Sequence, residues 1–182
     1  MAARSESARS KPVRTSWARP TLRGWVFLVG GICAAVIAYI VGRTEFLYAA
    51  GFMILLPIVG LLIVRLRPLR LTVVRTFSPA VVTAGTPTII ELSVRNVSGF
   101  ASAAAIWTDR IPWTPHTAGP GTLPVLAPGA VATGARGARL GYSLRPTLRG
   151  VYDIGPLEVS YNDPFGLASG NVAVGSSQSL YV

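Results

Sequence analysis

Few residues in this chain carry side chains suited to catalysis or metal binding. His116 is the only histidine and Cys33 the only cysteine among 182 residues. Cys33 lies inside a long apolar run and His116 inside a proline-rich stretch, so the pair does not resemble a nucleophile with its base. A zinc site needs three or four donors of this type. The sequence therefore disfavours both nucleophilic catalysis and zinc binding.

Three aspartates, Asp109, Asp153 and Asp163, could in principle meet around a calcium ion. They lack the dense acidic spacing of a calcium loop, so we expect structural roles instead. Asp109 is interpreted as a strand-end residue, and Asp163 as a turn initiator whose carboxylate caps nearby backbone N–H groups. No glycine-rich phosphate loop occurs either. We therefore expect no enzymatic activity and no cofactor or metal site.

The basic residues are concentrated beside two apolar runs. The chain has 17 lysines and arginines against 7 acidic residues, and ten of the basic residues flank these runs with a single glutamate. A nucleic-acid-binding domain would carry such an excess on its folded part, so we expect no nucleic-acid partner. The pattern points to the lipid bilayer as the partner.

Two stretches, residues 25–41 and 46–64, contain no charged residue and are long enough for transmembrane helices. At about 1.5 Å per residue they reach ~26 Å and ~28 Å. Only residues 42–45 join them, which requires an antiparallel helical hairpin, and Pro57 is expected to kink the second helix. The alternative, a cleaved signal in the first run, is disfavoured by its long basic region and by the lack of a suitable cleavage site.

Arginines near the span ends predict the orientation of the hairpin. The connecting turn has one basic residue, Arg43, whereas the outer flanks have six and four. Because basic residues favour the cytoplasmic side, we expect both termini in the cytoplasm and residues 42–45 outside, at the bacterial cytoplasmic membrane. The residues expected to set this topology are Arg19, Arg23, Arg65, Arg67 and Arg70.

Small residues recur every four positions in the first span, at Gly30, Ala34, Ala38 and Gly42. This spacing places them along one helix face and allows another helix to approach closely. We favour packing against the second span, and keep a helix-mediated homo-oligomer as the alternative.

From residue 69 onward the hydrophobic pattern changes to the period of two that is typical of β-strands. The clearest alternation lies at 69–73, 90–95, 139–145 and 157–162, with weaker candidates at 103–108, 151–154, 171–174 and 179–182. Together with the frequent turn residues, this predicts an antiparallel, immunoglobulin-like β-sandwich. The loop 111–128, with five prolines and Trp113, is expected to be irregular surface and is a possible contact site.

The resulting organisation has five parts. They are a basic cytoplasmic tail (1–24), helix one (25–41), an external turn (42–45), helix two (46–64) and an all-β cytoplasmic domain (65–182). The hexamer RPTLRG occurs twice, at residues 19–24 and 145–150. We expect the first copy to open a membrane helix. In the second copy, Pro146 should end a strand and Gly150 should adopt the positive φ of a tight turn.

The ordered segments TLRGW, DRIP, RGVYDIGP and DPFGL resemble the N-terminal half of the bacterial domain-of-unknown-function-58 family. The residues that carry this resemblance most specifically are Arg149, Gly150, Tyr152, Gly155, Pro156, Asp163, Pro164, Phe165, Gly166 and Leu167. The resemblance implies a membrane hairpin and a β-rich segment, followed in the family by a von Willebrand factor A-like domain that this sequence lacks. It also implies association with a MoxR-type AAA+ ATPase and a transglutaminase-like membrane protein, with no catalytic activity assigned.

These observations favour a membrane-anchored accessory or scaffold protein in an assembly or envelope-related process. Two alternatives stay open. The chain could be the anchoring half of a longer enzyme, or its sandwich could be a sensor or binding module outside the cell.

Overall fold

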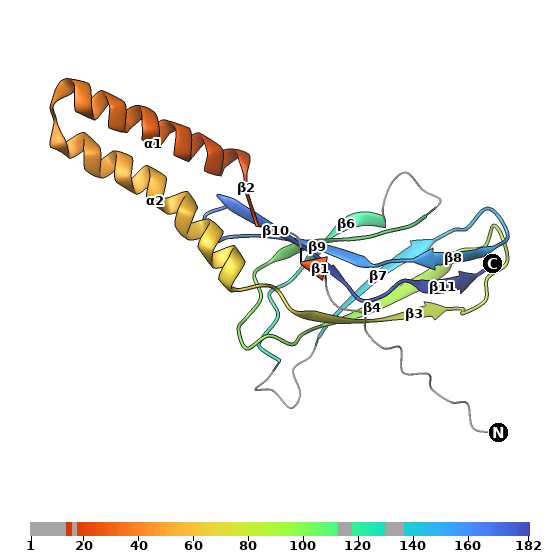
Figure 1. Cartoon of the computed structure of the whole chain (residues 1–182). Coiled ribbons are helices and arrows are strands. Elements are labelled where there is room, and N and C mark those ends of the chain that lie inside the picture. The colour runs from red at the N-terminus through yellow and green to blue at the C-terminus, as the bar shows by residue number, and fades with distance from the viewer. Residues whose placement is uncertain (1–13, 16–17, 113–117, 130–136) are drawn as a thin grey trace.

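The computed structural model describes residues 14–15, 18–112, 118–129 and 137–182. It consists of a helical hairpin that projects from one end of a β-sandwich (Figure 1). This arrangement confirms the predicted fold class, two apolar helices followed by an antiparallel, immunoglobulin-like sandwich. Trp113 and His116 lie outside the described residues.

The hairpin consists of α1 (Leu22–Val41) and α2 (Thr44–Leu66), which are both long and apolar enough to cross a membrane. The hydroxyl of Thr21 accepts a hydrogen bond from the Gly24 N–H and caps α1, so this helix begins three residues earlier than predicted. Gly42 ends α1 in the left-handed conformation at φ 68°, and α2 begins two residues later. The predicted four-residue turn is therefore only Gly42 and Arg43, and Pro57 lies inside α2.

The two helices pack through small residues, but not along the whole predicted stripe. Ala38 is buried, Gly30 and Ala34 are half-buried, and Gly42 is an exposed cap outside the contact. The closest approach occurs at Gly31, where a Cβ would lie 2.6 Å from Ile54 Cγ1. Buried positions on α1 therefore repeat every seven residues, at 24, 31 and 38, because packed helices follow a period near 3.5.

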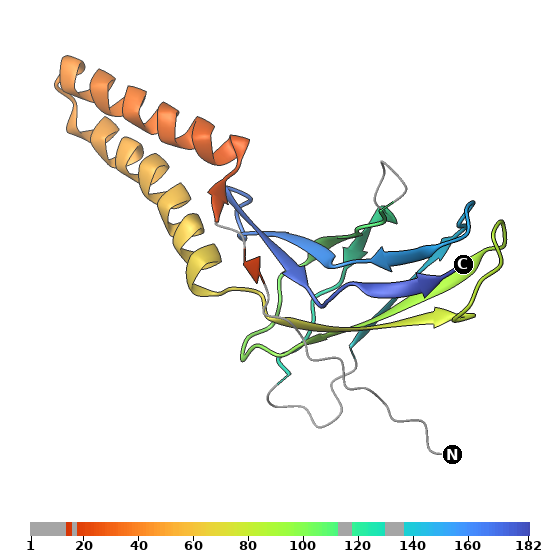
Figure 2. The same ribbon diagram turned by 45° about the vertical axis from the view of Figure 1, so that its right-hand side comes forward.

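The sandwich contains three groups of antiparallel strands (Figure 2). One sheet has the order β3 (Leu71–Ser78), β4 (Thr88–Asn96), β7 (Ala138–Leu144). The largest has the order β10 (Ala168–Val174), β9 (Leu157–Asn162), β5 (Ala105–Asp109), β6 (Ala118–Leu123). The third pairs β8 (Val151–Ile154) with β11 (Gln178–Tyr181). Alternate residues of β4 and β9 face a common core, in which Ile90, Leu92 and Val159 are fully buried.

The prediction of an irregular loop over residues 111–128 is wrong in part, and the N-terminal tail contains strands that the sequence did not indicate. Part of the loop 111–128 is strand β6, which pairs with β5 although its sequence AGPGTL lacks alternation. Its Gly121 lies against the Trp107 indole, where a larger residue would not fit. The N-terminal tail also contributes β1 (Arg14–Thr15) and β2 (Arg19–Pro20), which both pair with the outer edge of β10. These strands form because β10 offers unpaired backbone groups, which is a property of the folded sheet.

A buried ion pair links the sheets. Arg75 Nη2 of β3 lies 2.6 Å from Asp109 Oδ1 of β5, and both side chains are almost completely buried. The Tyr142 hydroxyl of β7 donates to Asp109 Oδ2 at 2.6 Å, and Arg75 Nη1 donates to the Ile154 carbonyl at 2.7 Å. Gly155 leaves room for this guanidinium, because a Cβ there would lie 2.7 Å from Nη1. Residues from four strands, β3, β5, β7 and β8, therefore contact one another through this ion pair.

Tyr142 is held in its neutral form by this environment. Burial is the main cause that raises the pKa of its hydroxyl, and the hydrogen bond to Asp109 is the second. The Trp107 ring, whose centroid lies 6.0 Å from that of Tyr142, covers the same region. The hydroxyl therefore acts as a hydrogen-bond donor and not as a base.

The ion pair gives a stability prediction. Replacing Asp109 by Asn should lower the free energy of unfolding by about 3–5 kcal/mol, because the buried Arg75 charge loses its counter-ion. We suggest measuring urea-dependent pulse proteolysis of the full chain in detergent. The matched control is Asp153→Asn, since Asp153 is exposed and accepts a single side-chain hydrogen bond, from the Ser179 hydroxyl, within the described residues. Equal stability of the two variants would contradict a structural role for the pair.

Candidate functional site

Helix α2 continues from the apolar hairpin into the sandwich core. Its residue Val64 is 5% exposed and belongs to the same hydrophobic cluster as the strands. Gly170 of β10 permits this approach, because a Cβ at that position would lie 3.0 Å from Val64 Cγ1 and closer still to the Tyr161 ring. Tyr161 is itself buried, and that burial raises its pKa. The junction between hairpin and sandwich is therefore packed and leaves no flexible linker.

The turn from Asp163 to Leu167 connects β9 and β10 at this junction. Asp163 is 5% exposed, and its carboxylate accepts hydrogen bonds from the Phe165 N–H at 3.0 Å and the Ala168 N–H at 2.6 Å. The Gly166 N–H donates to the Asp163 carbonyl, and Gly166 has φ 70°. This confirms the prediction that Asp163 initiates a turn and caps backbone N–H groups.

The same turn contacts the beginning of α1. The Thr21 N–H donates to the Leu167 carbonyl at 2.9 Å, and the Thr21 hydroxyl donates to the Gly166 carbonyl at 2.7 Å. A Cβ at Gly24 would overlap the Leu167 carbonyl oxygen, so only glycine allows this contact. The first copy of RPTLRG therefore touches the DPFGL segment directly, a relation that the sequence did not indicate.

The other side of the turn contacts α2. A Cβ at Gly60 would lie 2.9 Å from Asp163 Oδ2, so the carboxylate rests on the helix where a side chain is missing. The turn is thus held between α1 and α2, at the level where α1 begins. We call these five residues, Asp163 to Leu167, the docking turn.

The residues that carry the family resemblance occupy two distant places. Those of the docking turn lie at the hairpin, and Arg23 Nη1 lies 3.9 Å from the Cβ position of Gly166. Gly150 lies beside the C-terminus, which Figure 1 marks at the opposite end, and forms two backbone hydrogen bonds with Val182; its φ of 157° is positive, as predicted, but nearly extended, so it pairs with the chain end and does not form the predicted tight turn. Arg149 is exposed, and the Tyr152 hydroxyl donates to the Leu148 carbonyl. Gly155 and Pro156 lie beside the Arg75 pair and are joined by a cis peptide bond.

The arginines predicted to set the topology also fall into two groups. Arg23, Arg65, Arg67 and Arg70 are exposed at the junction. Arg19 belongs to β2, opposite Ser169 of β10. The sequence did not reveal that this part of the basic tail is paired with the sandwich, and the role of these arginines in setting the topology stays a prediction.

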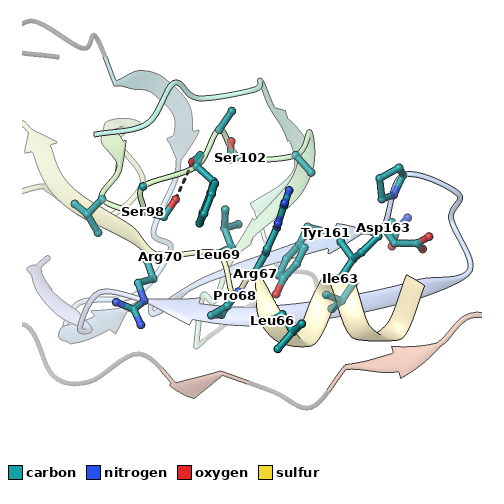
Figure 3. Close-up of a pocket in the computed structure, with 18 residues that line it drawn as sticks. Ile63, Leu66, Arg67, Pro68, Leu69, Arg70, Ser98, Ser102, Tyr161 and Asp163 are labelled. Carbon is teal, nitrogen blue, oxygen red and sulfur yellow. Dashed lines mark hydrogen bonds between the residues drawn. The ribbon is translucent and has the colours of Figure 1, made fainter. Parts of the chain in front are cut away.

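A cavity of about 510 Å³ lies where the end of α2 meets the sandwich (Figure 3). Its walls come from residues 63–64 and 66–70 at the helix end, the loop 97–103, and residues 161–164, which include the first two residues of the docking turn. Arg67 stacks over the Phe100 ring, with its guanidinium carbon 5.1 Å from the ring centroid. Arg70 also lines the cavity, whose walls are otherwise formed largely by apolar residues such as Ile63, Leu66 and Pro68.

A second, apolar cavity of about 480 Å³ opens beside the docking turn, between the two helices. Leu22, Val26 and Phe27 of α1 line it together with Leu56 of α2 and Phe165. Phe165 is 52% exposed and Leu22 is 82% exposed, next to Trp25 at 56%. Aromatic and aliphatic groups at this level suit the interface of a bilayer.

The chemistry available at the junction is that of binding. Within the described part of the chain, no three histidine, cysteine, aspartate or glutamate side chains are placed to hold a metal ion. The Ser102 hydroxyl accepts from the Leu126 N–H, and the Ser98 hydroxyl donates to Asn96 and Phe100. The Arg75–Asp109 pair lies in the core and lines neither cavity. The exposed groups at the junction are arginines and apolar side chains.

No protein-family model matches the chain, and no curated protein matches it. Among solved structures, the chain is similar to the CARDB domain of the PF1109 protein from Pyrococcus furiosus, with 19% sequence identity and a TM-score of 0.39. The match covers 58% of this chain and 93% of the CARDB chain. A solution structure of the same domain gives 20% identity, 58% and 94% coverage and a TM-score of 0.38. The PKD domain of an M14-like peptidase from a Thermoplasmatales archaeon shares 14% identity, with 59% and 94% coverage and a TM-score of 0.31. At this distance the likeness concerns the fold alone.

Proposed function

We propose that the chain is a membrane-anchored, non-enzymatic scaffold that holds its β-sandwich rigidly against the cytoplasmic face of the bilayer. The observation that carries this proposal is the continuity of α2 from the apolar hairpin into the sandwich core at Val64. A protein that only needed a tether would join the two parts by a flexible linker. A rigid junction instead fixes which face of the sandwich a partner meets.

The dimensions of the helices support this arrangement. Helix α2 has 23 residues and a length of about 34 Å, whereas a hydrocarbon core is about 30 Å thick. Gly60 contacts the docking turn at the level where α1 begins, and the residues up to Leu66 extend a further ~9 Å along the sandwich. The part of α2 from Thr44 to Gly60 is about 26 Å long, within a few ångströms of the thickness of a hydrocarbon core, and we assign the following turns to the domain outside.

The orientation can be tested by cysteine labelling. In a Cys33→Ala background, Ser143→Cys on the exposed face of β7 should react with an impermeant maleimide only after spheroplasts are lysed. Arg43→Cys, in the turn between the helices, is the matched control and should react in intact spheroplasts. The reverse pattern would place the sandwich outside the cell and favour the sensor alternative.

Rigidity can be tested with spin labels at Val29→Cys and Ile106→Cys, both on exposed sites, in the same cysteine-free background in nanodiscs. The parent should give one narrow distance distribution. Gly60→Val should broaden it, because the added side chain displaces the Asp163 carboxylate from α2. Gly51→Val is the control, since nothing lies within 4 Å of a Cβ there. A broad distribution in the parent would argue against a rigid scaffold, and an unchanged distribution in Gly60→Val would show that the contact of Gly60 with Asp163 does not provide the rigidity.

The proposed protein partner is a MoxR-type AAA+ ATPase, with a transglutaminase-like membrane protein as a second candidate. This part of the proposal rests on the family resemblance and on the expected cytoplasmic location of the sandwich. Affinity capture of the tagged full chain from native membranes, after crosslinking, should recover such an ATPase. Its absence from the captured material, while the chain itself is recovered intact, would count against the partnership.

A further inference from the structure

We propose that the 510 Å³ cavity at the end of α2 binds the headgroup of an anionic glycerophospholipid from the adjoining leaflet. The proposal rests on the proposed membrane anchoring and adds a specific ligand to it. The volume of the cavity lies within the range of about 300–1,000 Å³ that small-molecule sites occupy.

The depth of the cavity is the first argument. The docking turn marks the level at which α1 begins, and the cavity is lined by α2 residues from Ile63 onward, one helical turn beyond Gly60. A headgroup layer occupies roughly 5–8 Å on each side of the hydrocarbon core. A helical turn rises about 5.4 Å, so the cavity opens within that layer.

The charge of the cavity is the second argument. Arg67 and Arg70 both line it, and among the residues that the structure describes neither forms an ion pair. Phe100 holds the Arg67 guanidinium in place from one side. Asp163, the acidic residue of the lining, forms no ion pair with either arginine among the described residues, and its carboxylate accepts hydrogen bonds from the Phe165 and Ala168 N–H groups. Figure 3 shows the two guanidinium groups pointing in different directions, so Arg67, beside Phe100 and the apolar wall, is the group that would meet a phosphate attached to a hydrocarbon chain, and Arg70 adds positive charge at the edge of the cavity.

The surface of α2 supplies the path for the acyl chain. Leu55, Val59, Leu62 and Leu66 are exposed and spaced by four, three and four residues, so they form one apolar strip along the helix. Leu66 ends this strip and also lines the cavity. An acyl chain lying along the strip would therefore bring its phosphate to Arg67, which follows Leu66 in the chain. A free phosphate would use the arginines but not the strip.

The test uses the purified full chain in a non-ionic detergent, with native mass spectrometry of bound lipid. Phosphatidylglycerol should be retained in preference to phosphatidylcholine. The double substitution Arg67→Gln/Arg70→Gln should weaken phosphatidylglycerol binding roughly tenfold or more, because two surface charges near the phosphate are lost. The matched control Arg95→Gln/Arg139→Gln removes two exposed arginines of the sandwich and should leave binding unchanged.

Several results would overturn the proposal. These are equal retention of the two lipids, full retention in the Arg67/Arg70 variant, or an equal loss in the control variant. Displacement of the lipid by millimolar glycerol 3-phosphate would instead identify a soluble phosphate as the ligand.

Ala101→Trp, which fills the cavity from its exposed loop, should abolish the preference for phosphatidylglycerol while pulse proteolysis shows an intact sandwich. The mass-spectrometry result does not depend on the cysteine-labelling experiment, because phosphatidylglycerol can bind the purified protein whichever leaflet the cavity faces in the cell.

Discussion

The structure depends above all on the close approach of the docking turn to two helices at once. Gly24 and Gly60 remove the side chains that would keep the turn away, and Asp163 satisfies the backbone N–H groups that the tight turn leaves unpaired. Thr21 completes the contact, since it caps α1 and also binds the turn through its backbone and its hydroxyl. Because every one of these contacts involves backbone atoms, the position of the hairpin is fixed by geometry and tolerates little adjustment.

The docking turn can hold the hairpin in one position only because the strands that it connects are themselves held by pairing with their neighbours. Strands β9 and β10, which it connects, pair over six residues, and β10 also pairs with the short strands before α1. At the far side of the core the Arg75–Asp109 pair joins β3 to β5 and, through Tyr142 and Ile154, to β7 and β8. A buried charge pair is a costly way to gain stability, and among the described residues the Arg75 Nε has no hydrogen-bond partner, so breaking the pair would leave a buried charge uncompensated.

The location of the exposed groups agrees with a scaffold that works at a bilayer surface. The Arg75–Asp109 pair is enclosed in the core, whereas Arg67, Arg70, Phe100 and Phe165 are exposed around the end of α2 and the docking turn. A rigid connection transmits the orientation of the hairpin to the whole sandwich. A lipid bound at Arg67 and Arg70 would stiffen the same junction, so that anchoring and orientation would depend on one small region.

The sequence alone determined the elements whose pattern is local. Charge-free runs revealed both helices, alternation revealed most strands, and Asp163 before Pro164 revealed its turn. Only the tertiary structure decided which glycines matter: Gly31 and not Gly42 in the hairpin, and Gly24 and Gly60 at the docking turn, because close approach depends on a distant neighbour. Strands β1, β2 and β6 were also missed, since they form by pairing with an existing edge and not by their own pattern. Likewise Arg75 reads as one of many flanking arginines, and its burial with Asp109 follows from the pairing of sheets far apart in the chain.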